Sequence, residues 1–130
     1  MVTSVTVRDE TLGEITGELT LGFMTERVTA RELIRSRVYQ EVTEYNARQG
    51  GVFRGLVRPH DAERTREGFL LHCHRLINWT EQYESAVAAI EKTGFLILVD
   101  DRQITDLGTE IEIRHDAAVS FLRLVPLIGG

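Results

Sequence analysis

Two reactive side chains are scarce in this chain of 130 residues, which holds one cysteine, Cys73, and one lysine, Lys92. A single cysteine excludes an internal disulfide and favours a reducing compartment. The other 14 basic side chains are arginines. The simplest interpretation of this bias is a codon preference for arginine.

Long apolar runs, basic runs and a leader pattern are also missing. No apolar stretch approaches the length of a membrane span, and the first four residues lack the charged-then-apolar pattern of a signal peptide. The net charge of −5, with no basic stripe, argues against a nucleic-acid partner. We therefore expect one globular domain over residues 1–130, located in the cytoplasm, with neither membrane nor nucleic acid as a partner.

The N-terminal third predicts two strands. Apolar and polar residues alternate with the period of a half-buried strand in two segments, at Val5 and Val7 and again at Leu19, Leu21 and Phe23. These segments predict strands near 3–9 and 18–23 that pair antiparallel. Residues 13–17, which begin and end in glycine, predict a long hairpin connection.

A helix over 30–48 follows a capping box formed by Thr29 and Glu32. Gly50-Gly51 is a typical helix end. Its apolar residues recur at helical spacing, so the helix should pack across the sheet; they are Ala30, Leu33, Ile34, Val38, Val42 and Tyr45.

Residues 50–93 form an insertion whose structure the pattern leaves open. The charged stretch 61–68 indicates a mobile loop, and 69–77 fits either a strand or a helix. A second helix is expected over about 80–92, capped by Asn78 or Thr80. The insertion either packs as an extra layer beside the core or covers the C-terminal tail.

Catalytic and metal-binding patterns are not found. The run His72-Cys73-His74 offers two histidines on one face of a strand, whereas a structural zinc site uses four ligands. Neither a nucleophile elbow nor a phosphate-binding loop is present. We expect no bound metal or cofactor and no catalytic residue in this chain.

The C-terminal third predicts a buried strand over 95–99, a turn at Asp100-Asp101 and a short strand at Gln103-Ile104. Leu107, Ile111 and Ile113 anchor the crossing segment that follows. The last strand starts at Val119, and because both of its faces are largely apolar, it reads as a central strand. Pro126 stops this strand.

The tail Leu124-Val125-Pro126-Leu127-Ile128-Gly129-Gly130 resembles the ends of ubiquitin-like β-grasp proteins. It is also similar to the ends of the molybdopterin-synthase small subunit and related sulfur carriers. The order of elements resembles the same family, with two strands and a capped helix, then the strand, turn and short strand over 95–104, and a last strand. The resemblance covers roughly residues 1–48 and 94–130.

This resemblance implies an α+β fold, a mixed sheet of four or five strands with one helix packed across it. The helical insertion falls at about 50–93, and the flexible tail over 126–130. It also implies that the Gly130 carboxylate is the reactive group and that Gly129 gives access to it. An E1-like adenylating enzyme would consume ATP to activate this carboxylate, and would grip the tail through Arg123, Leu124, Pro126, Leu127 and Ile128.

Three functions follow from the resemblance. A ubiquitin-like modifier would be transferred to a target amine, with an E2-like enzyme and a deconjugating protease as further partners. A sulfur carrier would form a Gly130 thiocarboxylate for cofactor or tRNA thiolation. A non-conjugated binding or scaffold subunit would use neither chemistry. For a modifier, the rarity of lysine limits self-attachment and leaves Lys92 as the one internal acceptor.

An apolar patch beside the tail is a further expectation from the resemblance. Leu122, Leu124 or Ile104 either contribute to it on the outer sheet face or lie in the core.

Overall fold

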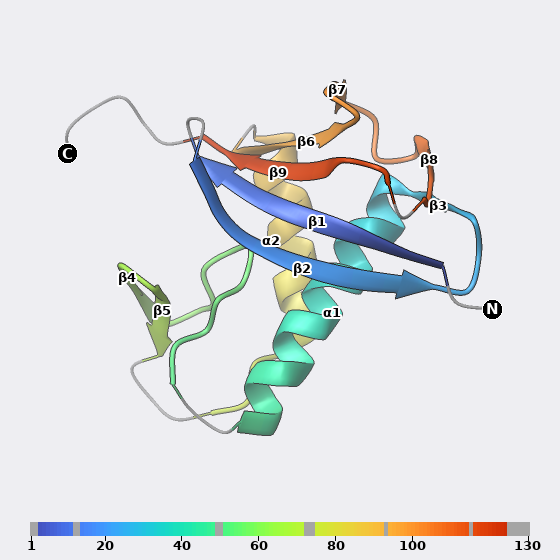
Figure 1. Cartoon of the computed structure of the whole chain (residues 1–130). Helices are drawn as coiled ribbons and strands as arrows, with labels where there is room; N and C mark the ends of the chain where they lie inside the picture. Colours follow the sequence, from blue (N-terminus) through green and yellow to red (C-terminus); the bar gives the residue numbers. More distant parts are fainter. Residues whose placement is uncertain are drawn as a thin grey trace. The chain divides into compact units, whose positions relative to one another are not determined.

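The computed structural model describes residues 3–11, 14–48, 51–71, 75–92, 94–114 and 116–124. Within them the fold is α+β (Figure 1). The elements, in chain order, are β1 (Thr3–Thr11), β2 (Glu14–Phe23), β3 (Arg27–Thr29), α1 (Ala30–Arg48), β4 (Ala62–Thr65), β5 (Gly68–Leu71), α2 (Trp79–Glu91), β6 (Phe95–Val99), β7 (Arg102–Ile104), β8 (Glu110–Glu112) and β9 (Val119–Arg123).

The chain divides into two compact units. Unit 1 comprises Met1–Leu33 and Ala89–Gly130, and unit 2 comprises Ile34–Ala88. Both helices therefore have residues in each unit. The expected packing of α1 across the sheet stays a prediction.

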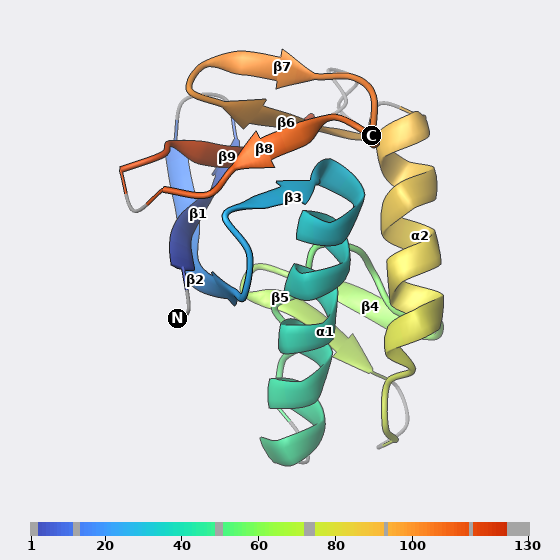
Figure 2. The ribbon, with the colours of Figure 1, turned by 90° about the vertical axis from the view of Figure 1, so that its right-hand side faces the viewer.

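Unit 1 is built on a five-stranded sheet in the order β2-β1-β9-β6-β7. Strands β1 and β9 are parallel, and the other neighbours are antiparallel, so the sheet is mixed. The expected antiparallel pairing of the first two strands and the central place of the last strand are both confirmed. A separate two-stranded sheet, which no pattern in the sequence predicted, joins β3 to β8 (Figure 2).

The long connection expected over residues 13–17 was wrong, because β2 already begins at Glu14. Gly17 pairs with Asp9 inside the ladder, and Ile15 pairs with Glu10. Thr16 is thus an extra residue in β2, and its hydroxyl donates to the Asp9 carbonyl at 3.3 Å. A glycine inside a strand often marks such a bulge rather than a turn.

One face of the five-stranded sheet carries the core of unit 1. Its centre is Phe121 of β9, which is 2% exposed and lies between Asp9 of β1 and Ile97 of β6 in the register. The Phe95 and Phe121 rings are 5.9 Å apart. Other buried residues of this face are Val5, Val7, Leu21 and Val119. Their period-two spacing is the one that the sequence shows.

The start of α1 is fixed by two sets of contacts. The Glu32 amide donates to the Thr29 hydroxyl at 3.1 Å, and the Thr29 amide donates to the Glu32 carboxylate at 3.4 Å, which confirms the capping box. The amides of Ala30 and Arg31 donate to the carbonyls of Thr109 and Leu107, both at 3.0 Å. The segment before β8 thus satisfies amides that a helix start leaves unpaired.

The turn at Asp100-Asp101 is confirmed, and both residues have positive φ angles of 50° and 66°. The Asp100 carboxylate accepts hydrogen bonds from the Ala118 amide at 3.0 Å and from the Arg114 guanidinium at 2.9 Å. These bonds tie the β6–β7 turn to the segment that enters β9. They lower the pKa of Asp100, the Ala118 amide first and the Arg114 hydrogen bond second.

We predict that Asp100→Asn lowers the melting temperature of the protein at neutral pH. Because the folded pKa is lowered, the carboxylate stabilises the fold above its unfolded pKa of about 3.9, and this contribution disappears as the pH falls through the folded value. Melting curves over a pH series should therefore converge for the two proteins in acid. Asp101→Asn, at the neighbouring turn position, is the matched control and should keep the wild-type melting temperature at neutral pH. Parallel curves for wild type and Asp100→Asn would contradict the assignment.

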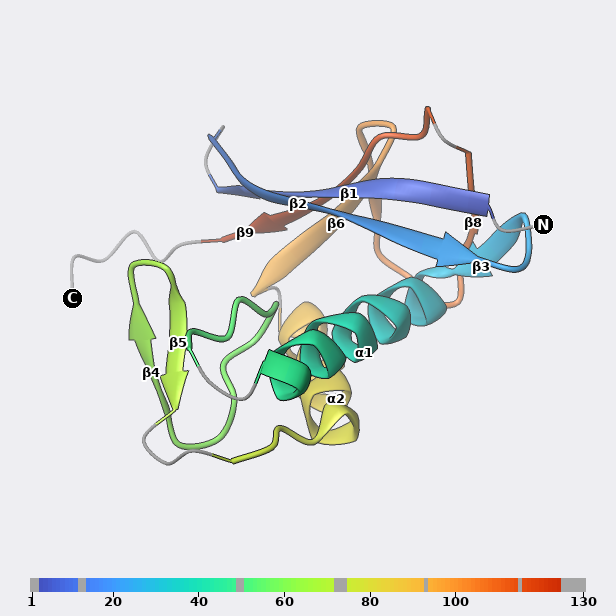
Figure 3. The same cartoon turned by 60° about the horizontal axis from the view of Figure 1, so that its bottom comes forward.

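Unit 2 contains a β4–β5 hairpin where a mobile loop was expected over 61–68, so that expectation was wrong (Figure 3). The hairpin is held by Phe69, whose amide and carbonyl both bond to Phe53 at 2.9 and 2.8 Å. The Phe53 ring also meets the Tyr45 ring edge-on at 5.5 Å. A few apolar anchors thus order a segment whose charged composition indicated mobility.

Polar side chains of α1 hold the irregular segments of unit 2. Glu41 of α1 accepts from the Arg37 guanidinium at 3.0 Å and from the Leu56 amide at 3.2 Å. The Arg37 side chain is only 2% exposed, so this ion pair is buried and fixes the segment after α1. Asn46 and Ile77 exchange two hydrogen bonds of 2.9 and 3.0 Å.

The second helix begins one residue before the expected start. Asn78 caps it by accepting from the amides of Thr80 and Glu81 at 2.9 and 3.1 Å, which settles the alternative between Asn78 and Thr80. Trp79, the first residue of α2, meets the Tyr39 ring edge-on at 5.4 Å and lies under the Arg35 guanidinium.

We predict that Gly68→Ala destabilises unit 2 by about 2 kcal/mol or more. Gly68 has a φ of 152°, and an added Cβ would lie 2.6 Å from the Phe53 carbonyl oxygen. Gly51→Ala is the control, since Gly51 has a φ of 85° but no atom within 4 Å of an added Cβ. Gly51→Ala should lower the free energy of unfolding by only about 1 kcal/mol, because alanine is strained at this positive φ. Urea unfolding followed by the fluorescence of the one tryptophan, Trp79, measures both, and equal losses would show that the close approach to Phe53 is unimportant.

Candidate functional site

The candidate site is the C-terminal end of β9, from which the tail continues. Arg123, the last residue of β9, pairs with Thr11 of β1 on one side and with Phe95 of β6 on the other. The Leu124 amide then donates to the Gly94 carbonyl at 3.1 Å. The backbone is therefore held on both sides up to the point where the tail begins.

Of the expected tail contacts, the structure places Arg123 and Leu124. Arg123 is half-buried and shares its sheet face with Phe121, whereas Leu124 is 40% exposed. The expected site residues Pro126, Leu127, Ile128, Gly129 and Gly130 lie outside the described residues, as does the run His72-Cys73-His74.

Lys92 lies close to this point in the fold. It follows directly after α2, and its side chain is exposed. Two residues later, the Gly94 amide donates to the Ala89 carbonyl at 2.7 Å, a bond that ends the helix, while the Gly94 carbonyl accepts from Leu124. Gly94 thus links the lysine to the start of the tail, a role that the sequence alone did not indicate.

Near the C-terminal end of β9, the outer face of the sheet carries apolar side chains around one acidic residue, Glu10. Leu122 of β9 lies between Glu10 of β1 and Leu96 of β6, and Glu10 also pairs with Ile15 of β2. Leu96 and Leu122 are half-buried, and Ile15 is 57% exposed. Leu98, on the next row of β6, belongs to the same face.

The register places two of the three apolar residues suggested for a patch, whereas the third, Leu124, follows the end of β9. Leu122 lies on the outer face, whereas Ile104 pairs with the buried Ile97 and so faces the core side. The outward position of Leu96 and Leu98 could not be predicted from the sequence. All residues of β6 are apolar, so the sequence shows no alternation that would separate the two faces of the strand.

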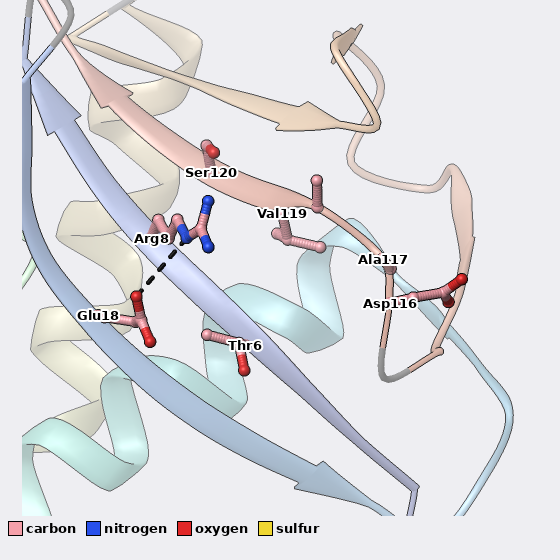
Figure 4. A pocket seen from close by; sticks show the side chains of 8 residues that line it. Thr6, Arg8, Glu18, Asp116, Ala117, Val119 and Ser120 are labelled. Carbon is pink, nitrogen blue, oxygen red and sulfur yellow. Dashed lines mark ion pairs between the residues drawn. The ribbon is translucent and has the colours of Figure 1, made fainter.

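A hollow of about 320 Å³ lies further along the same strands (Figure 4). Arg8 and Glu18, both more than half exposed, form an ion pair of 3.6 Å across it. Its lining residues are Thr6, Arg8, Glu18, Asp116, Ala117, Ala118, Val119 and Ser120. Its lining residues, all in the described part of the chain, combine one cation with carboxylates and hydroxyls.

Two further observations concern only the described residues. They hold no group of three or more side chains suited to bind a metal ion. None of their helices has the length and apolar character needed to cross a membrane.

Comparisons with known proteins, made against family models, curated sequences and solved structures, find no match to this chain.

We predict that the two faces of β9 respond differently to truncation. Phe121→Ala should lower the free energy of unfolding by about 3–5 kcal/mol, because it removes a buried ring and leaves a cavity in the core. Leu122→Ala, one residue on, should lose about 1 kcal/mol, because its side chain is already partly in water. Urea unfolding followed by circular dichroism tests both. Similar losses at the two positions would mean that Leu122 is a core residue and not part of an accessible face.

Proposed function

We propose that this chain is a ubiquitin-like modifier with a β-grasp fold. In this proposal an E1-like adenylating enzyme activates the Gly130 carboxylate with ATP, and the acyl group passes to an enzyme cysteine and then to a target amine. The chain is the substrate of these enzymes and contributes no catalytic residue of its own. An E2-like enzyme, a deconjugating protease and the target protein are its further partners.

The observation that carries the proposal is the anchoring of β9. This strand lies in the middle of the sheet and pairs with β1 and β6 as far as Arg123, and six residues that end in Gly129-Gly130 follow Leu124 in the sequence. An enzyme that pulls on such a tail pulls on the centre of the sheet, which resists better than an edge strand. Glycine at the last two positions leaves the carbonyl open to a nucleotide phosphate or a thiolate.

The order of elements also supports the proposal. Two strands, a capped helix, a strand with a tight turn and short strand, and a central last strand follow one another as the resemblance implies. Pro126 supports the alternative of a sulfur carrier, whose tail the sequence resembles as closely. The two functions share the activation step and differ only in the nucleophile that takes the acyl group.

The test begins with the intact mass of the protein isolated from its own cells, which establishes whether Gly130 carries the terminal carboxylate. Trypsin cleaves after Arg123, so a conjugated protein leaves the remnant Leu124–Gly130 on a target lysine. We expect such remnants in cells that express the wild-type chain and none in cells that express a Gly130-deleted chain.

Two other outcomes would overturn the modifier proposal. An unconjugated chain in which one oxygen is replaced by sulfur identifies the sulfur carrier. An unmodified chain, with no remnant and no effect of deleting Gly130, leaves a non-conjugated binding or scaffold subunit.

A further inference from the structure

We propose that the edge strand β2 is the docking site for a second copy of this chain. In the resulting dimer, the β2 strands of the two copies pair antiparallel about a twofold axis at Thr20, and the two five-stranded sheets become one continuous sheet. The inference concerns unit 1 alone and does not depend on the proposed function.

Strand β2 forms one edge of the sheet, and no strand other than β1 pairs with it among the described residues (Figure 1). It has ten residues, whereas β7 at the other edge has three. Proteins commonly protect a sheet edge with a short strand, a lysine, a proline or a bulge, since an open ladder can take up a further strand. The stretch Gly17–Phe23 of β2 has none of these four features.

The ladder between β1 and β2 sets the register of the proposed pairing. It is regular from Gly17 to Phe23 and is interrupted by the bulge at Thr16. The regular segment is therefore centred on Thr20. Two antiparallel copies of one segment overlap completely only when its middle residue lies on the twofold axis. Complete overlap gives about six to eight backbone hydrogen bonds between the copies, two for every second residue pair.

The apolar residues of this segment match one another in that register. Leu19 of one copy lies opposite Leu21 of the second copy, and Phe23 lies opposite Gly17. Leu19 and Phe23 are half-buried in the single chain, so the pairing removes further apolar surface from water. An aromatic ring across the strand compensates for an edge glycine, and the dimer contains this pair twice. The segment is thus complementary to itself, as a twofold interface requires.

The same register keeps like charges apart. Glu18 is the one charged residue of the segment, and it lies opposite Gly22 of the second copy. The two Glu18 Cα atoms are then about 14 Å apart, which exceeds the Debye length of about 8 Å at physiological ionic strength. Glu18 also forms the ion pair of 3.6 Å with Arg8 of its own chain. An axis at Glu18 would instead oppose the two carboxylates and shorten the ladder, so charge and overlap select the same axis.

Charges placed on the axis test this register, because position 20 faces itself in the dimer. Thr20→Arg and Thr20→Glu each set like charges opposite one another, and each should weaken dimerisation about fivefold or more. An equimolar mixture of the two variants should recover the dimer, because opposite charges then face each other. Sedimentation from micromolar to millimolar protein measures the association, and native mass spectrometry identifies mixed dimers by the different masses of the two variants.

The wild-type chain should show a weak, reversible dimer, because the contact between two strand edges is smaller than a standard protein interface. Its own hydrogen exchange gives a second measurement that needs no variant. The amides from Gly17 to Phe23 should exchange more slowly as the protein concentration rises.

Gln103→Arg and Gln103→Glu are the matched controls. Gln103 is exposed and pairs with Leu98 on the outer face, but it lies in β7 at the opposite edge of the sheet. These variants introduce the same charges, and the dissociation constant should stay at the wild-type value for each variant and for their mixture. Melting curves by circular dichroism establish that all four variants are folded.

A wild-type chain that stays monomeric at millimolar concentration would overturn the inference. So would a dimer that the Thr20 variants leave unchanged, or that the Gln103 variants weaken equally, since the contact would then lie elsewhere or depend on total charge. Folded Thr20 variants that lose the dimer separately and do not recover it in the mixture would refute the axis at this residue.

Discussion

The fold of unit 1 depends on the parallel pairing of β1 with β9. Val7 lies opposite Val119, and Asp9 lies opposite Phe121, so residues separated by more than a hundred positions in the chain share one register. Without β9 the sheet has no centre, because β9 is the one strand that joins the β1–β2 hairpin to the β6–β7 hairpin. Such distant pairing is costly in chain entropy and forms slowly. It also means that any force on the tail is borne by the middle of the sheet.

Short polar contacts hold the connections around this sheet. Asp100 ties the β6–β7 turn to Ala118, just before β9, and the carbonyls of Leu107 and Thr109 meet the first amides of α1. Each contact satisfies a backbone group that the end of an element would leave unpaired. The end of β9 is held in the same way by Gly94, and this bond brings Lys92 close to the start of the tail. One backbone hydrogen bond therefore links the candidate site to the one lysine in the chain.

Charge is divided unevenly between the two units. Unit 1 holds 13 acidic and 7 basic side chains, whereas unit 2 holds 7 acidic and 8 basic ones. The acidic excess of the protein is therefore carried by the unit that contains the sheet and the candidate site. Unit 2 instead uses a buried ion pair, Arg37 with Glu41, to hold its irregular segment. Removing one partner of such a pair is strongly destabilising, because it leaves an uncompensated buried charge.

The sequence by itself determined the local elements of this protein: the capped start of α1 at Thr29, the turn at Asp100-Asp101 and the alternation of β1 were all predicted, because each depends on neighbouring residues. The apolar character of both faces of the last strand also predicted its central place. Tertiary structure alone decided the rest. The β4–β5 hairpin exists because Phe69 bonds to Phe53, and Leu96 faces outward because Leu122 sets its register. The closeness of Lys92 to Leu124 follows from the bond to Gly94. These contacts join residues far apart in sequence, and no local pattern encodes the partner of a distant residue.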